Sequence, residues 1–335
     1  FRGAQAFDAA QPFTVVREQT SVLLPTPGTR RRASDLVREH GAEAVLFGAA
    51  APLGLLAPAL REAGATRTVG ITHGHEAGWA GYPAVRSVLR RVGQNLDVLT
   101  YLGEYTRRRI GTALSAEAAA RMVKLTPGVD ADLFRPDVDD RGVRERHGLG
   151  DRPVVVCVSR LMPRKGQDTL IRALPRIRMA VPDAALLLVG GGPYRGRLER
   201  LAADTGMAQH VVLTGSVPLE ALPEHFAAGD VFAMPCRTRH LGLDVEGLGI
   251  VYLEASATGL PVVAGRSGGA PDAVLPGRTG DVVDGTDVPV VAEAVAGLLA
   301  DPARRDRLGA AGRAWVAEAW TWERSSERLG ELLAG

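Results

Sequence analysis

Short apolar runs alternate with longer amphipathic stretches along the whole chain, and this alternation predicts two parallel sheets. Continuous Val- and Leu-rich strands separated by helical patterns are typical of parallel sheets with helices on both faces. Because crossovers between parallel strands are right-handed, the pattern indicates a doubly wound α/β architecture, formed twice. The predicted strands are AVLFG (44–48), TVGI (68–71), LDVLTY (96–101), PVVVCVS (153–159), ALLLVG (185–190), HVVLTG (210–215), DVFAMP (230–235), LPVVAG (260–265) and GDVVDG (280–285).

A polar segment rich in Gly, Pro and charge, RPDVDDRGVRERHGLGDRP (135–153), separates the two groups of strands. The chain of 335 residues also exceeds what one hydrophobic core usually supports. We therefore expect a hinge between Thr126 and Pro153. The predicted units are an N-terminal domain (1–140), a C-terminal domain (141–318) and a terminal helix (319–335) that crosses back to the first domain.

The first segment of the chain lacks a feature that doubly wound domains normally have. Such a domain opens with a strand and a glycine-rich turn at its first βα junction. The sequence FRGAQAFDAAQPFTVVRE contains no such turn. We expect that roughly fifty residues, enough for a strand, this turn and a helix, precede the chain. A first domain that is built differently is the alternative.

Composition narrows the class of protein. Hydrophobic residues make up 46% and charged residues 23% of the chain, which is ordinary for a globular protein. No apolar run is long enough for a transmembrane helix, and the first residues do not resemble a signal peptide. Cys157 lies inside an apolar run and Cys236 follows one, so we expect buried thiols in a reducing cytoplasm.

Charge is distributed unevenly between the two halves. Residues 1–128 contain 16 Lys and Arg against 10 Asp and Glu, whereas the remainder contains 24 against 28. A basic N-terminal half suits phosphate groups or an anionic membrane surface. An ordinary solvated surface of an Arg-rich protein is the alternative.

Two glutamates flank the start of a predicted helix in GLDVEGLGIVYLEASATGLPVVAG (242–265). The helix is expected from about Leu248 to Thr258, with Glu246 before it and Glu254 two turns along it. Unpaired amides at a helix start attract anions, so a diphosphate could bind there, with Glu254 on a ribose and Glu246 on a sugar. The alternative is an acid near a helix start and a solvated surface residue. The amides concerned are those of Gly249, Ile250 and Val251.

Basic residues follow another strand end, in VSRLMPRKGQ (158–167). Ligands of such sheets bind beyond the carboxyl ends of the strands. Arg160 can grip a phosphate with two hydrogen bonds and Lys165 can supply a point charge, which together would offset a departing diphosphate. Two solvated basic residues are the alternative. Gly191, in GGGP (190–193), is a weaker candidate for close approach of a ligand.

Histidines follow a third strand end, in THGHEAGW (72–79). We expect His73 to act in the cleft as a hydrogen-bonding or acid–base group, with a structural histidine as the alternative. His73 and His75 could chelate a metal ion. No third ligand with suitable spacing accompanies them, so we predict no metal site.

The segment GYPAVRSVLRRVG (81–93) reads as an amphipathic, basic helix beside Trp79. Its apolar residues recur at helical spacing, and arginines lie alongside them. This helix could lie against anionic lipid or could simply pack on its own sheet. The apolar positions are Val85, Val88, Leu89 and Val92, and the residues assigned to the acceptor and membrane side are His75, Trp79, Tyr82, Arg86, Arg90 and Arg91.

Taken together, these motifs resemble the retaining nucleotide-sugar glycosyltransferases of the GT-B fold. The segments THGHE, TPGVDADLFRP, VSRLMPRKGQDTL, LLLVGGGPY and the pair of glutamates carry the likeness. Within that family the tract FAMPCRTRHLGLDVEGLGIVYLEASATGLPVVAGRSGGAPDAV is most similar to actinobacterial GDP-mannose-dependent phosphatidylinositol monomannoside α-1,6-mannosyltransferases.

The resemblance implies two facing Rossmann-like domains with a cleft between them, the second of which binds most of the donor. Arg160 and Lys165 would then hold the diphosphate, and Glu254 the ribose. Glu246 and the amides at 249–251 would contact the transferred sugar. His73 would lie near the reacting centre, with His75 as a weaker candidate. Ser216 and Val217 would border the base.

The resemblance also implies the reaction, which is transfer of mannose from GDP-mannose to a phosphatidylinositol mannoside-type lipid with retention of configuration. The departing diphosphate can take the proton, so no protein nucleophile or cofactor is needed. We expect a cytoplasmic enzyme at the inner face of the plasma membrane that binds no nucleic acid. Metal dependence and oligomeric state stay open. The alternatives are a transferase that uses another nucleotide sugar, such as a UDP-sugar, and a sugar-nucleotide-binding module without transferase activity.

Overall fold

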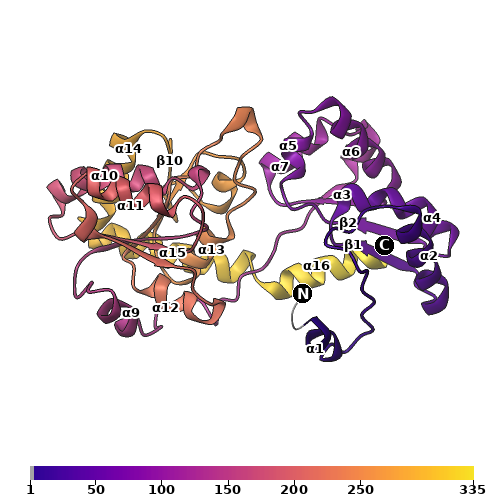
Figure 1. The fold of residues 1–335 in the computed structure, drawn as a ribbon, viewed down its shortest axis with the longest axis horizontal. Coiled ribbons are helices and arrows are strands. Elements are labelled where there is room, and N and C mark those ends of the chain that lie inside the picture. The colour runs from indigo at the N-terminus through magenta and orange to yellow at the C-terminus, as the bar shows by residue number, and fades with distance from the viewer. Residues whose placement is uncertain (1–3) are drawn as a thin grey trace.

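Two α/β domains stand side by side in the computed structural model, which describes residues 4–335 (Figure 1). The N-terminal domain, in indigo and purple, and the C-terminal domain, in magenta to orange, are bridged by the last helix, in yellow. The predicted α/β class with two parallel sheets is confirmed.

The N-terminal domain contains a parallel sheet of the order β1-β2-β3-β4 among the described residues. Three of these strands confirm the prediction. The prediction lacks β4 because its three residues, MVK, include none that is buried and give no apolar run. The strands are β1 (Ala44–Phe47), β2 (Arg67–Gly70), β3 (Val98–Tyr101) and β4 (Met122–Lys124). The helices are α1 (Ala4–Ala9), α2 (Pro27–His40), α3 (Ala50–Leu53), α4 (Ala57–Glu62), α5 (Glu76–Trp79), α6 (Pro83–Asn95), α7 (Glu104–Gly111) and α8 (Ala116–Ala120).

The C-terminal domain contains a larger parallel sheet, in the order β10-β9-β8-β5-β6-β7. Strand order reverses direction at β5, which pairs with β6 on one side and β8 on the other, so ligands are expected beyond the carboxyl ends there. The strands are β5 (Val154–Val158), β6 (Ala185–Val189), β7 (Val211–Gly215), β8 (Val231–Met234), β9 (Val262–Gly265) and β10 (Gly280–Val283), all six at predicted positions. The helices are α9 (Arg141–Arg146), α10 (Gln167–Ala180), α11 (Arg195–Asp204), α12 (Leu222–Ala227), α13 (Ile250–Ala257), α14 (Val288–Leu299), α15 (Pro302–Ala319) and α16 (Trp322–Ala334).

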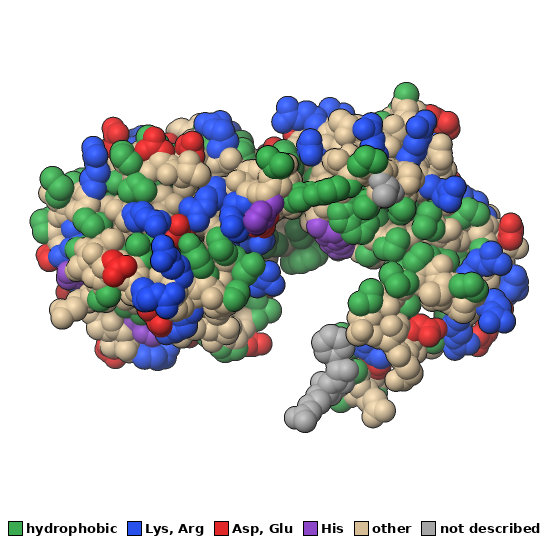
Figure 2. Space-filling model, turned by 45° about the horizontal axis from the view of Figure 1, so that its top comes forward, with side chains coloured by type: hydrophobic (Ala, Val, Ile, Leu, Met, Phe, Trp, Pro, Cys, Tyr) green, Lys and Arg blue, Asp and Glu red, His purple; other side chains and the backbone are tan. Residues whose placement is uncertain are grey.

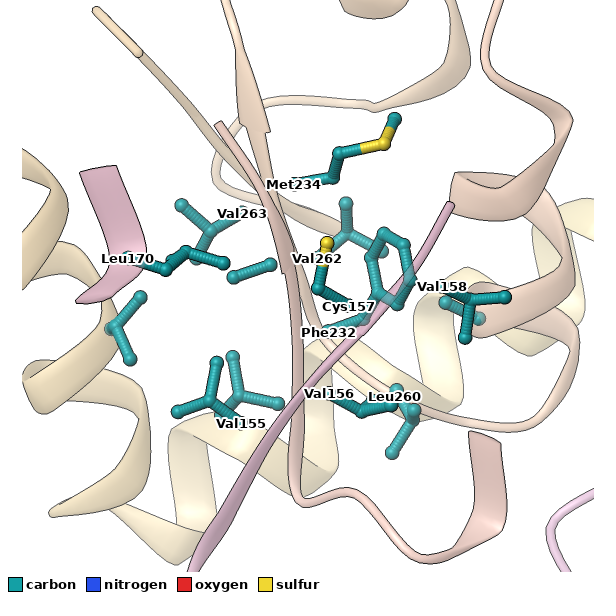
Figure 3. Packing of buried hydrophobic residues seen from close by; sticks show 14 of the residues in the cluster. Val155, Val156, Cys157, Val158, Leu170, Phe232, Met234, Leu260, Val262 and Val263 are labelled. Carbon is teal, nitrogen blue, oxygen red and sulfur yellow. The ribbon is translucent and has the colours of Figure 1, made fainter. Parts of the chain in front are cut away.

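The core of the C-terminal domain forms around the central strands, where every residue of β5, β8 and β9 is buried (Figure 3). This explains why these strands read as continuous apolar runs rather than alternating ones. Cys157 and Cys236 are buried there as predicted. Burial raises the pKa of each thiol to about 12, so both stay protonated and poorly nucleophilic at neutral pH.

Two segments cross between the domains and touch each other. The linker after β4 donates from the Val129 amide to the Trp320 carbonyl over 2.7 Å. A Cβ at Gly128 would lie 2.3 Å from the backbone nitrogen of Trp322, so only glycine allows this approach. Helix α16 then packs on β1 and β2, and Arg67 Nε donates to the Leu332 carbonyl over 2.9 Å. The domain limits 1–140, 141–318 and 319–335 stay a prediction.

Helix α6 confirms the amphipathic pattern and shows where its apolar face goes. Leu89 and Val92 are buried in the N-terminal domain. The arginines at 86, 90 and 91 point away from that core and are exposed. Among residues 4–335, no helix combines the length and apolarity needed to cross a bilayer.

Candidate active site

A cavity of about 490 Å³ lies between the two domains, and both domains contribute to its wall. Its position beyond the carboxyl ends of β2 and β5 is where parallel sheets bind ligands. The N-terminal domain and the linker supply His73, Gly74, His75, Leu102 and Pro127, and the C-terminal domain supplies Arg164, Lys165 and residues 243–251.

A buried ion pair forms part of the cavity wall. Lys165 Nζ lies 2.6 Å from Glu246 Oε2, and the two residues are only 8% and 6% exposed. Lys165 ends a short 3-10 turn, Pro163–Lys165, and Gly166 follows in a left-handed conformation (φ 79°). A Cβ at Gly166 would lie 2.1 Å from the Pro235 carbonyl oxygen, so glycine is required to place Lys165. Sequence reasoning found both charged residues but not that they pair.

Arg164 is a cavity residue that sequence reasoning missed. Its Nε lies 3.7 Å from Asp244 Oδ1 and 3.8 Å from Glu246 Oε2, and makes no hydrogen bond within the described part of the chain. The sequence offers two adjacent basic residues, and only the turn geometry shows that both face the cavity. Two cations thus meet two carboxylates at the position where a diphosphate is expected.

Helix α13 starts at the cavity, slightly later than predicted. Gly249 precedes it with φ 80°, and the helix covers Ile250 to Ala257. Glu254 is therefore about one turn into the helix, not two, because the chain from Glu246 to Gly249 is not helical. The first amides of an α-helix have no acceptor in the helix, so this start can offer donors to an anion. That these amides bind a diphosphate stays a prediction.

Glu254 lies largely buried on α13, just outside the cavity wall. Its carboxylate has no hydrogen-bond or ion-pair partner among residues 4–335. Burial without such a partner raises the pKa of Glu254 to about 7. The unfolded value is near 4.5, so this group destabilises the ligand-free fold progressively as pH rises from about 4.5 to about 7.

This shift predicts a pH-dependent nucleotide affinity. Ribose hydroxyls that donate to Glu254 would stabilise its charged form, so binding should release a proton. We expect the Kd for GDP to fall about tenfold between about pH 6 and about pH 8 through this group. Calorimetry across that range measures the change. The Glu254→Gln variant retains the titration of GDP itself and should lose this part of the pH dependence; an unchanged profile in the variant would remove Glu254 from the ribose site.

The histidine segment lies on the opposite wall and is held by Glu76, which sequence reasoning did not assign. His73 Nε2 donates to the Gly48 carbonyl, and this fixes the ring and leaves Nδ1 free to accept from a sugar hydroxyl. The fully buried Glu76 accepts from the His73 amide over 3.0 Å, and its Oε1 lies 3.5 Å from His75 Nε2. Within residues 4–335, no group of three or more His, Cys, Asp or Glu side chains is placed to bind a metal ion.

The two walls of the cavity meet through glycine backbone. A Cβ at Gly74 would lie 3.0 Å from Gly247 Cα, and Gly74 has φ 92°. Near this contact, Asp272 accepts a hydrogen bond from the Tyr105 amide over 3.2 Å. These approaches bring His73 and Glu246, which are far apart in sequence, to the same cavity.

Gly74→Ala should therefore impair catalysis more than donor binding. The methyl group would push Gly247 away and strain the backbone, at a cost of about 1–3 kcal/mol. We expect transfer activity to drop about tenfold or more while the Kd for GDP changes less than about threefold, because a widened contact separates His73 from Glu246. Gly111→Ala, where no atom lies within 4 Å of the added Cβ, is the matched control. Equal activity in the two variants would show that the glycine contact does not matter for transfer.

Several expected site residues lie outside the cavity wall. The exposed Arg160 follows β5, and its carbonyl accepts a hydrogen bond from Gln167 Nε2 over 3.0 Å. A Cβ at Gly191 would lie 2.4 Å from Ser216 Oγ, so Gly191 and the segment before Val217 are neighbours at the same sheet edge. The structure thus groups Lys165, Glu246, the α13 start, His73 and His75 around one cavity. The remaining assigned residues, Trp79, Tyr82, Arg86, Arg90 and Arg91, lie on or beside α5 and α6.

The chain is similar to known glycosyltransferases. Residues 139–315 match the family model described as glycosyl transferases group 1. The chain is 57% identical to a GDP-mannose-dependent alpha-(1-6)-phosphatidylinositol monomannoside mannosyltransferase of Mycolicibacterium smegmatis, over 100% of this chain and 88% of that protein. It is 54% identical, with the same coverage, to a protein of the same name from Mycobacterium tuberculosis.

Solved structures of low sequence identity share the fold. Anabaena HepE in complex with UDP superposes with a TM-score of 0.79 at 20% identity, over 92% of this chain and 82% of that one. Sucrose-phosphate synthase from Thermosynechococcus elongatus gives a TM-score of 0.75 at 24% identity, over 96% and 80% of the two chains.

Proposed function

The chain belongs to the group 1 glycosyltransferases of the GT-B fold, and we propose that it transfers mannose from GDP-mannose to a phosphatidylinositol monomannoside-type lipid, with an α-1,6 linkage. The observation that carries this proposal is the identity of 54–57% over the whole chain to relatives named for that reaction. Expectations drawn from the sequence motifs point to the same reaction.

In this proposal the C-terminal domain binds the donor. The free amides at the start of α13 and the cations Arg164 and Lys165 would hold the diphosphate, because a fixed dipole and two positive charges favour an anion strongly in a partly buried site. Arg160 would reach the phosphates from the end of β5. Glu254 would accept from the ribose, and the edge at Gly191 and Val217 would border the base.

The charges around the cavity favour transfer with retention through the leaving group. Glu246 is the carboxylate assigned to the sugar, but Lys165 and Arg164 surround it. A carboxylate held by two cations is a poor nucleophile. The acceptor hydroxyl would instead attack from the face that the diphosphate leaves, and the diphosphate would take its proton. Lys165 and Arg164 would offset the charge that develops on the leaving group.

The acceptor approaches from the N-terminal domain in this proposal. His73 would accept a hydrogen bond near the reacting centre, and His75 would lie on the acceptor side. A lipid acceptor requires the enzyme to work at a membrane. The exposed arginines of α6, at 86, 90 and 91, would attract the anionic inner face of the plasma membrane, with Trp79 and Tyr82 beside them. The enzyme would therefore be peripheral and cytoplasmic.

Calorimetric titration of the purified protein with GDP, UDP and ADP tests the donor first. We expect GDP to bind with a Kd of about micromolar magnitude and GDP-mannose to bind as tightly or more tightly. Product analysis with a phosphatidylinositol monomannoside acceptor then tests the reaction. Preference for UDP would overturn the donor but keep the site. Tight GDP-mannose binding without transfer would indicate a binding module, and absence of any nucleotide binding would refute the site itself.

A further inference from the structure

A hairpin tip on the C-terminal domain has a strained backbone and carries a fully exposed leucine. His240 and Leu241 have φ values of 49° and 54°, in the left-handed region that non-glycine residues avoid, and Gly242 follows with φ 93°. Leu241 is completely exposed, at 105%. Two backbone hydrogen bonds between Arg239 and Asp244 close the hairpin behind the tip. The turn therefore exposes an apolar side chain to water, and this side chain does not stabilise the fold through burial.

This tip packs against helix α5 of the other domain. A Cβ at Gly78, in α5, would lie 3.5 Å from the Leu243 carbonyl and 3.8 Å from Leu243 Cδ2. Helix α5 leads directly into α6 through Tyr82, which is 46% exposed. In Figure 1 the hairpin, in orange, rises beside α5 at the upper edge of the molecule. The tip therefore meets the other domain at α5, where Leu243 also lines the cavity, and α5 precedes Tyr82 and the basic helix α6 in the chain.

Helix α6 can supply charge to a membrane but little apolar surface. Its sequence PAVRSVLRRVGQN contains no acidic residue, and Figure 2 shows Lys and Arg side chains along the upper edge of the N-terminal domain. Its apolar residues Leu89 and Val92 are already buried in the domain core. Stable association with a bilayer usually takes two signals, an apolar insertion together with basic residues. The apolar insertion must come from another segment.

We propose that the hairpin tip 240–243 inserts Leu241 into the lipid surface that the α6 arginines attract. The occupant is an anionic phospholipid bilayer, because the charge beside the tip is positive and the tip itself is a single exposed leucine. Both domains then contact the membrane at the same time, on either side of the cavity mouth. The cavity thus opens toward a lipid acceptor in the membrane. This inference rests on the proposed function only in that the acceptor is a lipid.

Flotation with vesicles of phosphatidylcholine mixed with phosphatidylinositol tests the proposal. Leu241→Gly removes the side chain and suits the left-handed backbone, so it should not harm folding. We expect it to lower the vesicle partition coefficient about tenfold. Leu241→Trp should raise that coefficient. The matched control is Leu219→Ala, which truncates another exposed leucine (61%) of the same domain and should leave partitioning unchanged. The Arg90→Ala/Arg91→Ala variant should lose binding to the mixed vesicles and keep only the weak binding seen with pure phosphatidylcholine.

The outcomes separate this inference from the proposed function. Equal partitioning of Leu241→Gly and the unchanged protein, or an equal loss in Leu219→Ala, would overturn the inference even if mannose transfer is observed. Transfer to a water-soluble mannosyl-inositol phosphate without acyl chains reports on the reaction alone, and Leu241→Gly should perform it normally. Leu241-dependent partitioning without any such transfer would support the inference and refute the function.

Discussion

Lys165→Ala is expected to reduce kcat/KM for mannose transfer by about a thousandfold and to raise the Kd for GDP at the same time. Lys165 is buried beside Glu246, at 2.6 Å, on the cavity wall next to the start of α13. Removing it deletes a cation that would stabilise the diphosphate both in the bound donor and in the transition state, an effect of about 10²–10³ in rate alone. Steady-state kinetics with GDP-mannose and calorimetry with GDP measure the two effects.

The same substitution should also destabilise the fold. The substitution leaves the buried Glu246 with only the more distant Arg164, at 3.8 Å. Breaking a buried ion pair typically costs up to about 3–5 kcal/mol of unfolding free energy. A Lys165→Met/Glu246→Gln double variant removes both charges and should regain most of the lost Tm without regaining activity, which separates folding from chemistry. Lys124→Ala is the matched control, because Lys124 is the only other lysine in the sequence and lies outside the cavity. Unchanged kinetics in Lys165→Ala would remove Lys165 from the site.

Glu246→Gln is expected to lower kcat by about a hundredfold while changing the Kd for GDP less than about threefold. Glutamine preserves the shape and can still accept a hydrogen bond from Lys165, so the anion-binding site keeps its geometry. The negative charge that would support the positively charged sugar in the transition state is lost, together with an acceptor for sugar hydroxyls. Turnover should therefore suffer much more than nucleotide binding.

The two glutamates provide controls for each other. Glu254→Gln should alter GDP affinity and its pH dependence, since Glu254 is assigned to the ribose, whereas Glu246→Gln should alter turnover. Titration of each variant with GDP and with GDP-mannose, compared with its kcat, tests this opposite pattern of effects on affinity and turnover. If Glu246→Gln weakened GDP as strongly as it slowed transfer, Glu246 would belong to the nucleotide site and the assignment to the sugar would be wrong.

Hydrophobic patterning predicts most of the fold because the spacing of apolar residues along a strand or a helix is a local property of the sequence. The runs that became β5, β8 and β9 are apolar at every position, since both faces of these strands are covered. Strand β4 escaped detection because an edge strand of three residues needs no such run. The start of α13 was placed two residues early, because a left-handed Gly249 is invisible in a pattern of apolar residues.

The sequence predicts the candidate site as separate segments: the basic and histidine segments just past the ends of predicted strands, and the two glutamates around the start of a predicted helix. Parallel sheets gather these ends at one edge, so a shared location within each domain followed from topology. Sheet topology does not show which neighbouring side chains face the cavity. No local pattern shows that Arg164, beside Lys165, faces the cavity, or that the Glu76 carboxylate is buried rather than solvated.

The sequence alone determined the two α/β domains, the family and the residue types that meet at the site, because these depend on periodicity and on motifs of a few residues. Only the tertiary structure decided that Lys165 pairs with Glu246 and that burial lifts the pKa of Glu254 to about 7. It also decided that α6 buries Leu89 and Val92, whereas Leu241 on the other domain stays fully exposed. The physical reason is that pairing, burial and exposure are set by contacts between segments distant in sequence, and these exist only once both domains have folded and met.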